Sequence, residues 1–438
     1  MKLKDTYDDC LQTMYGLRRF GIKLELSTIQ GILNGLENPQ NRMACIHVAG
    51  TNGKGSVASA LASILRLASY SVGLYTSPHL VKFNERICIN GRPISDENVV
   101  LSYEAVKSVR HGGREPTFFE FSTAMALYEF GRQKVEWAVI ETGMGGRLDA
   151  TNIIKPALAV ITNISVEHKM YLGNTITQIA AEKGGIIKKY TPVVTGVKQK
   201  SVISVLKTIA GSQSAPFYRF GDAFRVRRNR NGTFNYYGIE HIWPNLQTGL
   251  MGRYQVDNAA IVLAACEVLN KTRTDLPLET IKDGLMQNRW PGRLEVVSRS
   301  PLVILDGAHN FNAARNLARF LSENLAGRNI TLVVGILDDK PYKAMLKSLL
   351  PFCSRAILTA PKIDRALPPE TLLAVAQQIV AETTIVPDVD SAVQHAVETA
   401  SPDDVICIAG SLYVVGEAKE ALGKKDSPIN KKLQALGA

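Results

Sequence analysis

Short apolar runs alternate with helical patterns in the first third of the chain. Residues 45–49 form an apolar run that ends in a glycine-rich segment, and apolar side chains then recur at helical spacing from Val57 to Ala68. This order predicts a strand, a glycine loop and a helix. Further apolar runs predict strands at 137–140, 158–161 and 192–194. Because strands and helices alternate, we predict a mostly parallel sheet with helices on both faces.

A second set of strand signals begins near residue 299. The apolar runs of this set lie at 302–305, 332–336, 356–358, 384–386 and 405–408. Helical stretches such as 312–323 and 369–380 separate them. The segment 289–293, which contains Pro and Gly, precedes this second set of predicted strands and is typical of a domain boundary. We therefore predict an α/β protein with two domains, at 1–297 and 298–438.

The composition is that of an ordinary globular protein, with 438 residues, 45% of them hydrophobic and 21% charged. It excludes a disordered chain, a collagen and a disulfide-stapled miniprotein. No run approaches the roughly 20 apolar residues that span a bilayer, and the first residues lack the apolar core of a signal peptide. The six cysteines are far apart, which predicts buried free thiols in a reducing compartment. We expect a cytoplasmic protein with no membrane partner.

Basic residues outnumber acidic ones by 51 to 40, which gives a formal net charge of +11. Their densest cluster is 225–230, which Asn231-Gly232 separates from the β-prone stretch 233–237. This order predicts a β-hairpin, and a solvated hairpin is the more common role for such a cluster. The other basic residues are scattered, which suits the binding of several small anions as well as it suits DNA.

The glycine-rich segment 50–56 reads Gly-Thr-Asn-Gly-Lys-Gly-Ser. Its glycines allow backbone N–H groups to point inward, and the helix that follows offers its positive end to phosphates. Lys54 would reach the outer phosphates, and a hydroxyl would bind Mg²⁺. The segment departs from a strict Walker A motif, since Val48 and Gly55 replace the expected Gly and Ser/Thr and the hydroxyl comes later, at Ser56. A tight structural turn is the simpler alternative, but the lysine and the hydroxyl favour a polyphosphate site.

Two side chains follow predicted strands and extend this site. Glu141 comes directly after 137–140, and His168 lies just past another strand. Neighbouring parallel strands bring their carboxyl ends together, where such sheets bind ligands. Each residue alone is typical of a structural role, but together with Ser56 they predict a site for one cation.

Several further motifs accompany the glycine loop. They lie at 76–80, 83–87, 117–120, 143–152, 182–187, 258–260, 290–293, 306–310 and 410–413. Together these segments resemble the folylpolyglutamate synthase/dihydrofolate synthase enzymes, within the Mur-ligase-like ATP-dependent amide ligases. The resemblance runs from about residue 15 to residue 416. Gly55 favours this branch, since peptidoglycan Mur ligases typically carry Thr at that position.

The resemblance implies a P-loop-type N-terminal domain with a mostly parallel sheet and a smaller Rossmann-like C-terminal domain. It implies a ligase that uses ATP to convert a pterin or folate carboxylate into an acyl phosphate, which the amine of L-glutamate then attacks. The implied partners are ATP, L-glutamate and dihydropteroate or a reduced folate, with no nucleic acid, and the protein is expected to be a monomer. Dihydrofolate synthesis, polyglutamate extension and a combination of both stay open.

The resemblance also implies roles for individual residues. Those expected to bind the nucleotide are Gly50, Thr51, Asn52, Gly53, Lys54, Gly55, Ser56, Asn258, Arg293, Asp306 and His309. Two Mg²⁺ ions are expected, with ligands Ser56, Glu141, His168 and Lys183. The catalytic side chains would be Lys54, Lys183 and His309. The residues that match the pterin pocket are Lys23, Leu24, Glu25, Leu26, Thr117, Phe118, Phe119, Glu120, Leu148, Asp149 and Ala150.

Lys183 matches a lysine that is carbamylated in many relatives, where the carbamate would hold the second Mg²⁺. An ordinary lysine that pairs with the γ-phosphate is the simpler alternative. Three positions depart from the family pattern: Glu167 stands in place of Asp, Gly184 in place of Ala, and Glu25 at a position often held by glycine. None of these changes removes a required functional group.

Other functions use similar motifs. A peptidoglycan-type Mur ligase would add an amino acid to a UDP-muramoyl substrate, and a P-loop NTPase would act on nucleic acid. The broken Walker spacing and the scattered basic charge argue against the second. A degenerate binding protein is a further alternative, but the nucleotide and metal residues are all present.

Overall fold

The computed structural model describes residues 6–110, 112–271, 273–424, 429 and 432. The chain forms two compact units. The first contains the chain up to Pro78, Phe83–Gly249 and Gln255–Arg289, and the second contains His79–Lys82, Leu250–Tyr254 and the chain from Trp290 on. The predicted domain limits at 297 and 298 stay a prediction.

An eight-stranded sheet is the centre of the first unit, in the order β4-β3-β2-β5-β1-β6-β7-β8. Its strands are β1 (Ala44–Ala49), β2 (Val72–Tyr75), β3 (Ile87–Ile89), β4 (Arg92–Pro93), β5 (Trp137–Glu141), β6 (Leu158–Ile161), β7 (Val193–Thr195) and β8 (Phe217–Arg219). All neighbours from β2 to β8 are parallel, whereas β3 and β4 pair antiparallel. The mostly parallel sheet is therefore confirmed. Strand β1 lies between β5 and β6, so the segment that follows β1 lies beside the ends of both.

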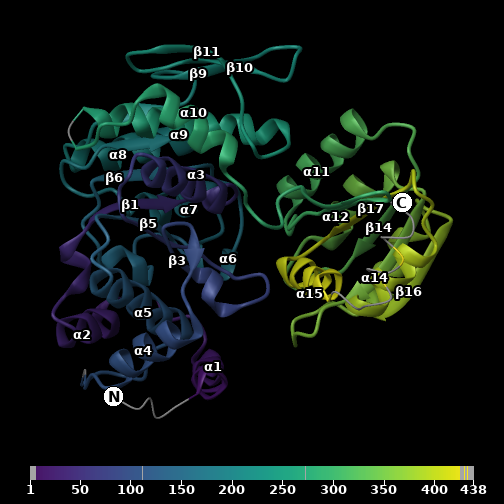
Figure 1. Cartoon of the computed structure of the whole chain (residues 1–438), viewed down its shortest axis with the longest axis horizontal. Helices are drawn as coiled ribbons and strands as arrows, with labels where there is room; N and C mark the ends of the chain where they lie inside the picture. The colour runs from purple at the N-terminus through teal and green to yellow at the C-terminus, as the bar shows by residue number, and fades with distance from the viewer. Residues whose placement is uncertain (1–5, 111, 272, 425–428, 430–431, 433–438) are drawn as a thin grey trace. The chain divides into compact units, whose positions relative to one another are not determined.

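Helices cover both sides of this sheet (Figure 1). Figure 1 shows α3, α9 and α10 on one side of the strands, and α4 and α5 on the other. The helices of this unit are α1 (Tyr7–Gly16), α2 (Ser27–Gly35), α3 (Lys54–Leu67), α4 (Asp96–Lys107), α5 (Phe118–Arg132), α6 (Lys169–Leu172), α7 (Ile176–Gly184), α8 (Lys200–Ser212), α9 (Arg253–Asn270) and α10 (Leu278–Gln287). The core between α5 and the strands contains Tyr75, Ala138 and Ile140, which shows that α5 packs on β2 and β5.

The predicted hairpin forms two strands of a second, three-stranded sheet. Strands β9 (Arg225–Arg228), β10 (Phe234–Tyr237) and β11 (Ile242–Leu246) are antiparallel in the order β11-β10-β9. The buried carboxylate of Glu267, on α9, anchors this sheet. It accepts hydrogen bonds from the Tyr236 hydroxyl at 2.6 Å and from the backbone N–H of Ile239 and His241, both at 2.8 Å.

The second unit contains a six-stranded sheet in the order β12-β13-β17-β14-β15-β16. Its strands are β12 (Glu295–Arg299), β13 (Leu302–Leu305), β14 (Ile330–Val334), β15 (Arg355–Ala360), β16 (Glu382–Asp388) and β17 (Val405–Ala409). Only β12 is antiparallel to its neighbour. The five predicted strands are confirmed, although β14 begins and ends two residues before the predicted range.

Helices cover both faces of this second sheet too. They are α11 (Phe311–Asn324), α12 (Tyr342–Leu349), α13 (Pro369–Ala376), α14 (Val389–Glu398) and α15 (Leu412–Gly423). Alternate residues of β13 belong to different cores: Ile304 packs with α11, α12 and α13, whereas Val303 and Leu305 pack with α14 and α15. This period of two gives the unit its three layers.

The six cysteines are all free thiols. Cys10, Cys45, Cys266 and Cys407 are buried as predicted, but Cys88 and Cys353 are partly exposed, so the prediction of burial was wrong for these two. Cys88 lies on the three-residue strand β3, next to the edge strand β4. Among the described residues, no helix combines the length and the apolar character that a bilayer crossing requires.

Candidate active site

Two glycines allow the loop after β1 to pass close to its neighbours. Gly50 has φ of +147°, and a Cβ atom there would lie 2.0 Å from the hydroxyl oxygen of Thr162. Gly53 has φ of +84°, and its Cβ atom would lie 2.6 Å from the side-chain oxygen of Asn258. Residues with a side chain rarely adopt such backbone angles, and here they would also clash. The loop therefore needs glycine at both positions.

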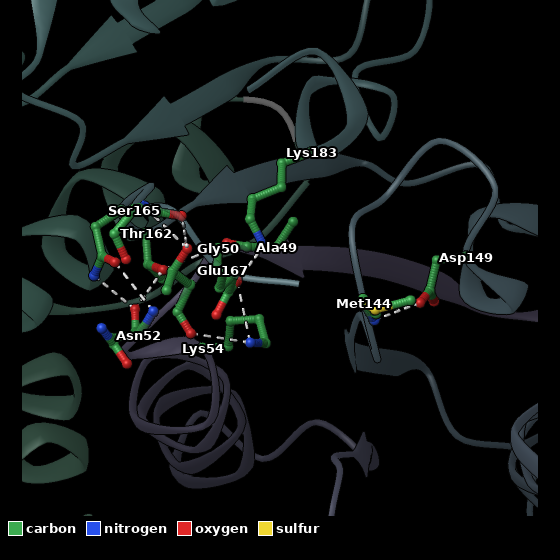
Figure 2. Close-up of polar contacts among 12 residues, drawn as sticks. Ala49, Gly50, Asn52, Lys54, Met144, Asp149, Thr162, Ser165, Glu167 and Lys183 are labelled. Carbon is green, nitrogen blue, oxygen red and sulfur yellow. Dashed lines mark hydrogen bonds and ion pairs between the residues drawn. The ribbon is translucent and has the colours of Figure 1, made fainter. Parts of the chain in front are cut away.

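The end of β6 holds this loop in shape. The Asn163 side chain accepts a hydrogen bond from the Asn52 N–H at 3.0 Å and donates one to the Asn52 carbonyl at 2.7 Å. The Thr162 hydroxyl donates to the same carbonyl, also at 2.7 Å. Figure 2 shows Asn52 and Thr162 beside the first turn of α3. The loop is thus fixed directly before a helix of 14 residues, whose positive end favours phosphate.

Two lysines meet at the loop. The Lys54 Nζ atom donates to the carbonyl oxygens of Gly50 at 3.1 Å and of Thr51 at 3.2 Å. The Lys183 Nζ atom, from α7, donates to the same Gly50 oxygen at 2.9 Å (Figure 2). Glu141 Oε1 lies 4.0 Å from Lys54 Nζ, and Glu167 Oε1 lies 2.9 Å from Lys183 Nζ. Two cations and two carboxylates therefore surround one point of the loop.

Burial and neighbouring charges have opposite effects on the pKa values of Lys183 and Glu167. Lys183 is 1% exposed, and this burial lowers the pKa of its amine, although the Glu167 carboxylate opposes the change. Burial also opposes ionisation of Glu167, but the charges of Lys183 and Lys54 outweigh it and bring the pKa of Glu167 to about 2. Glu167 is a site residue that the sequence did not assign. Its signals were its position next to His168 and its place where the family usually has Asp.

The predicted metal ligands lie at the ends of different elements. Ser56 is in the first turn of α3, and Glu141 ends β5 opposite Val48 of β1. Glu141 Oε2 accepts a hydrogen bond from the Ser77 N–H at 3.3 Å. His168 immediately precedes α6 with φ of +47°. No group of three His, Cys, Asp or Glu side chains with metal-binding geometry exists in the described part of the chain. The predicted set instead combines a hydroxyl, a carboxylate, an imidazole and the carbamate expected at Lys183.

Side chains of helix α9 also lie against the glycine loop and the first turn of α3. The Asn258 Nδ2 atom donates to Gln255 Oε1 at 2.8 Å, and Gln255 Nε2 donates to the Ser56 hydroxyl at 3.3 Å. Since Asn258 also faces Gly53, the two amides of α9 line both the loop and the first turn of α3. The prediction did not include Gln255, and no local sequence signal marks it.

The three predicted substrate segments are brought together. Gly143 lies so close to the ring of Phe119 that a Cβ atom would be 2.5 Å from it, which joins the 143–150 loop to the start of α5. Asp149 shapes that loop by accepting hydrogen bonds from the Met144 N–H at 2.8 Å and the Thr151 hydroxyl at 2.5 Å. Burial raises the pKa of Asp149, against the effect of these donors. Glu25, in the third segment, reaches α5 through Arg114.

The remaining predicted nucleotide residues lie in the second unit. Asp306 follows β13, and its Oδ2 atom accepts a hydrogen bond from the Leu294 N–H at 2.9 Å. Burial raises the pKa of Asp306 to about 6, although the neighbouring Arg293 opposes this. His309 Nδ1 lies 2.8 Å from the Gly307 carbonyl oxygen. Because a carbonyl oxygen can only accept, Nδ1 carries the proton and Nε2 is the basic nitrogen.

Comparison with known proteins matches this arrangement. The Mur ligase middle domain matches residues 48–266, and the Mur ligase glutamate ligase domain matches residues 292–412. A Bacillus subtilis protein named dihydrofolate synthase/folylpolyglutamate synthase is 35% identical over 429 residues, which cover 95% of this chain and 99% of that protein. The chain belongs to the folylpolyglutamate synthase/dihydrofolate synthase family.

Solved structures of this family share the fold. Escherichia coli FolC in complex with DHPP and ADP has a TM-score of 0.90 at 28% identity, over 98% of this chain and 100% of that one. The bifunctional Yersinia pestis synthase, complexed with AMPPNP and a Mn ion, has a TM-score of 0.86 at 30% identity, over 96% and 99% of the two chains. Membership in the synthase family makes the protein an ATP-dependent glutamate ligase.

Proposed function

We propose that the protein joins L-glutamate to the carboxylate of dihydropteroate or of a reduced folate, with ATP as the phosphoryl donor. The observation that carries this proposal is the convergence of Lys54 and Lys183 on the Gly50 carbonyl at the start of α3. ATP and the acceptor carboxylate are both anions, so a fixed cluster of cations lowers the barrier to their approach. The Bacillus subtilis relative, which matches this chain almost end to end, is named for both activities.

The reaction has two steps. An acceptor carboxylate oxygen attacks the γ-phosphorus of ATP, and the bond to ADP breaks to leave an acyl phosphate. The amine of glutamate then attacks the acyl carbon, an amide forms, and inorganic phosphate leaves. In the first step Lys54 would transfer its hydrogen bonds from the loop carbonyls to the outer phosphates. The loop N–H groups and the positive end of α3 would hold the remaining phosphate charge.

The same proposal includes a divalent cation at the loop. The hydroxyl of Ser56 and the carboxylate of Glu141 are oxygen donors of the kind that Mg²⁺ prefers, and His168 would complete the set. When bound, Mg²⁺ offsets negative charge on the phosphates. The Yersinia pestis synthase structure contains both AMPPNP and a Mn ion, which supports a divalent-cation site in this protein.

Lys183 is proposed as a carbamate that holds a second Mg²⁺. A carbamate would replace its positive charge with a negative one, beside the carboxylate of Glu167. Two acidic groups at that point would need a cation between them, which is the reason to expect a metal there. The simpler alternative keeps Lys183 as an ammonium that binds phosphate, and it agrees with the present contact to Glu167 at 2.9 Å.

Acceptor binding is proposed at the aromatic start of α5. Phe118 and Phe119 offer flat apolar faces of the kind on which a pterin ring stacks, and the 148–150 segment lies beside them through the contact of Gly143 with Phe119. Arg293, Asp306 and His309 of the second unit would bind the nucleotide. We further propose that the protein acts in the cytoplasm as a monomer, in keeping with its free cysteines.

One assay tests the proposal. ADP release is measured with ATP, Mg²⁺ and L-glutamate, with dihydropteroate in one arm and tetrahydrofolate in the other. Glutamate-dependent ADP release in either arm, with an amide product of the expected mass, supports the proposal, and the ratio of the arms separates dihydrofolate synthesis from chain extension. No product in both arms, or a product only with a UDP-muramoyl substrate, would refute it.

A further inference from the structure

We propose that Glu25 and Arg114 are positioning residues for acceptor binding: their ion pair fastens the segment 21–26 to the start of α5. This inference rests on the proposed function, because the two segments that the pair joins are the ones proposed to bind the pterin. It assigns a role to Glu25, which stands where relatives often have glycine, and to Arg114, which has no assigned role.

Glu120 is the buried carboxylate that holds Arg114 in place. Its side chain is 3% exposed, and its two oxygens accept hydrogen bonds from both terminal nitrogens of Arg114, at 3.0 and 2.8 Å. The Thr117 N–H and hydroxyl donate to the same carboxylate at 2.8 and 2.9 Å, which closes the capping box of α5. Because a two-pronged Arg–carboxylate contact fixes the plane of the guanidinium, Glu120 also decides where the third nitrogen of Arg114 points.

The third nitrogen of Arg114 binds Glu25, the more exposed partner of the pair. Arg114 Nε donates to Glu25 Oε1 at 2.5 Å. The Glu25 side chain is 46% exposed and that of Arg114 is 29% exposed, so water competes for this contact but not for the buried one with Glu120. Residues 21–25 form neither helix nor strand. The ion pair is therefore a weak, reversible attachment of an irregular segment to a rigid helix start.

Arg18, which precedes the segment 21–26 in the chain, is held at Phe118, the first residue of α5. The Arg18 guanidinium lies 4.2 Å from the centre of the Tyr15 ring and 5.2 Å from that of Phe118, and the two rings stack at 5.7 Å. The stretch from Arg18 to Glu25 is thus held at Phe118 on one side and, through Arg114, at Glu120 on the other. A ligand that binds at this end of α5 would lie beside both attachment points, and the Glu25 contact favours the position of the stretch that the structure describes.

The expected effect is small and specific. A solvent-exposed ion pair changes an equilibrium by about two- to fivefold at low ionic strength, and salt screens it. Glu25→Gln keeps the size of the side chain and its hydrogen-bonding oxygen but removes the charge. It should raise the dissociation constant of dihydropteroate by about two- to fivefold. It should leave that of ATP unchanged, because the glycine loop does not contact Glu25.

The experiment is a binding titration of 7,8-dihydropteroate to the full chain by calorimetry, which does not depend on turnover. Wild type and Glu25→Gln are compared at low ionic strength and in about 1 M NaCl. At the higher salt concentration the screening length is about 3 Å, so the difference between their dissociation constants should disappear. Glu37→Gln is the matched control, since Glu37 also forms an exposed pair, with Arg42 at 3.1 Å. It should bind dihydropteroate like wild type.

A double-mutant cycle tests whether Glu25 acts through Arg114. In an Arg114→Gln background, Glu25→Gln should cause no further loss of affinity. Equal affinity of wild type and Glu25→Gln at low salt would overturn this inference alone, as would a loss that persists at high salt. If wild type itself fails to bind dihydropteroate, the proposed acceptor fails and this inference fails with it.

Discussion

The side-chain nitrogens of Lys54 and Lys183 both donate to the Gly50 carbonyl oxygen, at 3.1 and 2.9 Å. Lys54 is the first residue of α3, and Lys183 lies in the last turn of α7. Two helices far apart in the chain therefore deliver positive charge to one point of the glycine loop. Glu141 and Glu167 balance these charges.

Lys54→Ala should abolish most of the ligase activity. Without the ammonium, the outer phosphates lose a preorganised charge partner as the acyl phosphate forms, and losses of about 10²–10³-fold in kcat are typical of such a change. The measurement is glutamate-dependent ADP release, with the melting temperature as a check on folding. Lys207→Ala, at an exposed position of α8, is the control and should keep full activity. Near-normal turnover of a folded Lys54→Ala protein would refute the phosphate site.

His168→Ala should raise the Mg²⁺ concentration needed for half-maximal activity. Ser56 and Glu141 would still supply two ligands, so activity should return at high Mg²⁺. The melting temperature of the variant is measured as a check on folding. A Mg²⁺ titration of both proteins is the measurement. An unchanged Mg²⁺ requirement combined with a lower melting temperature would instead show a structural histidine.

Lys183→Arg distinguishes the carbamate from an ordinary cation. Arginine keeps a positive charge but cannot form the same carbamate, so the variant should be inactive if the proposal is correct. Lys183→Ala should also be inactive, with partial recovery when a short carboxylic acid is added. In wild type, ¹³C NMR with labelled bicarbonate should show a carbamate signal that the arginine variant lacks. Substantial activity of Lys183→Arg would show that charge alone suffices.

Asp306→Asn should make the stability of the protein less dependent on pH. Burial raises the pKa of Asp306 to about 6 in the folded protein, above its ordinary value of 3.8. The folded state therefore binds the proton more tightly than the unfolded state, and the stability that this provides is complete below about pH 4 and is lost as the pH rises through about 6. Asparagine cannot ionise, and it keeps an oxygen for the Leu294 N–H.

Urea unfolding of wild type and Asp306→Asn at pH 4.5, 6 and 7.5 is the corresponding measurement. The variant should gain free energy of unfolding relative to wild type as the pH rises. A difference that is the same at all three pH values would contradict the assigned pKa. Asp388→Asn is a suitable control, because hydrogen bonds from Ser391 lower the pKa of this partly exposed helix cap. The carboxylate is therefore largely ionised in both states at all three pH values, and the difference between this variant and wild type should stay nearly constant.

Much of the framework could be predicted from the chain alone. The runs at 137–140, 158–161 and 302–305 became β5, β6 and β13 with shifts of at most one residue, because buried parallel strands are continuous apolar segments. The Asn231-Gly232 pair correctly marked a hairpin, with Gly232 at φ of +81°. The short strands β3 and β4 were missed, since two or three residues cannot show a period.

The sequence by itself determined the glycine loop, the strand that leads into it and the residues whose chemistry points to phosphate. These signals are local, because the glycines, the lysine, the hydroxyl and the helix that follows them are consecutive in the chain. Only the tertiary structure decided that Gln255 reaches Ser56 across 199 positions and that Glu167, rather than another acid, pairs with Lys183. Such contacts depend on how α9 and α7 pack against the sheet. This packing brings together residues that are far apart in the chain, so no local sequence pattern predicts their contact.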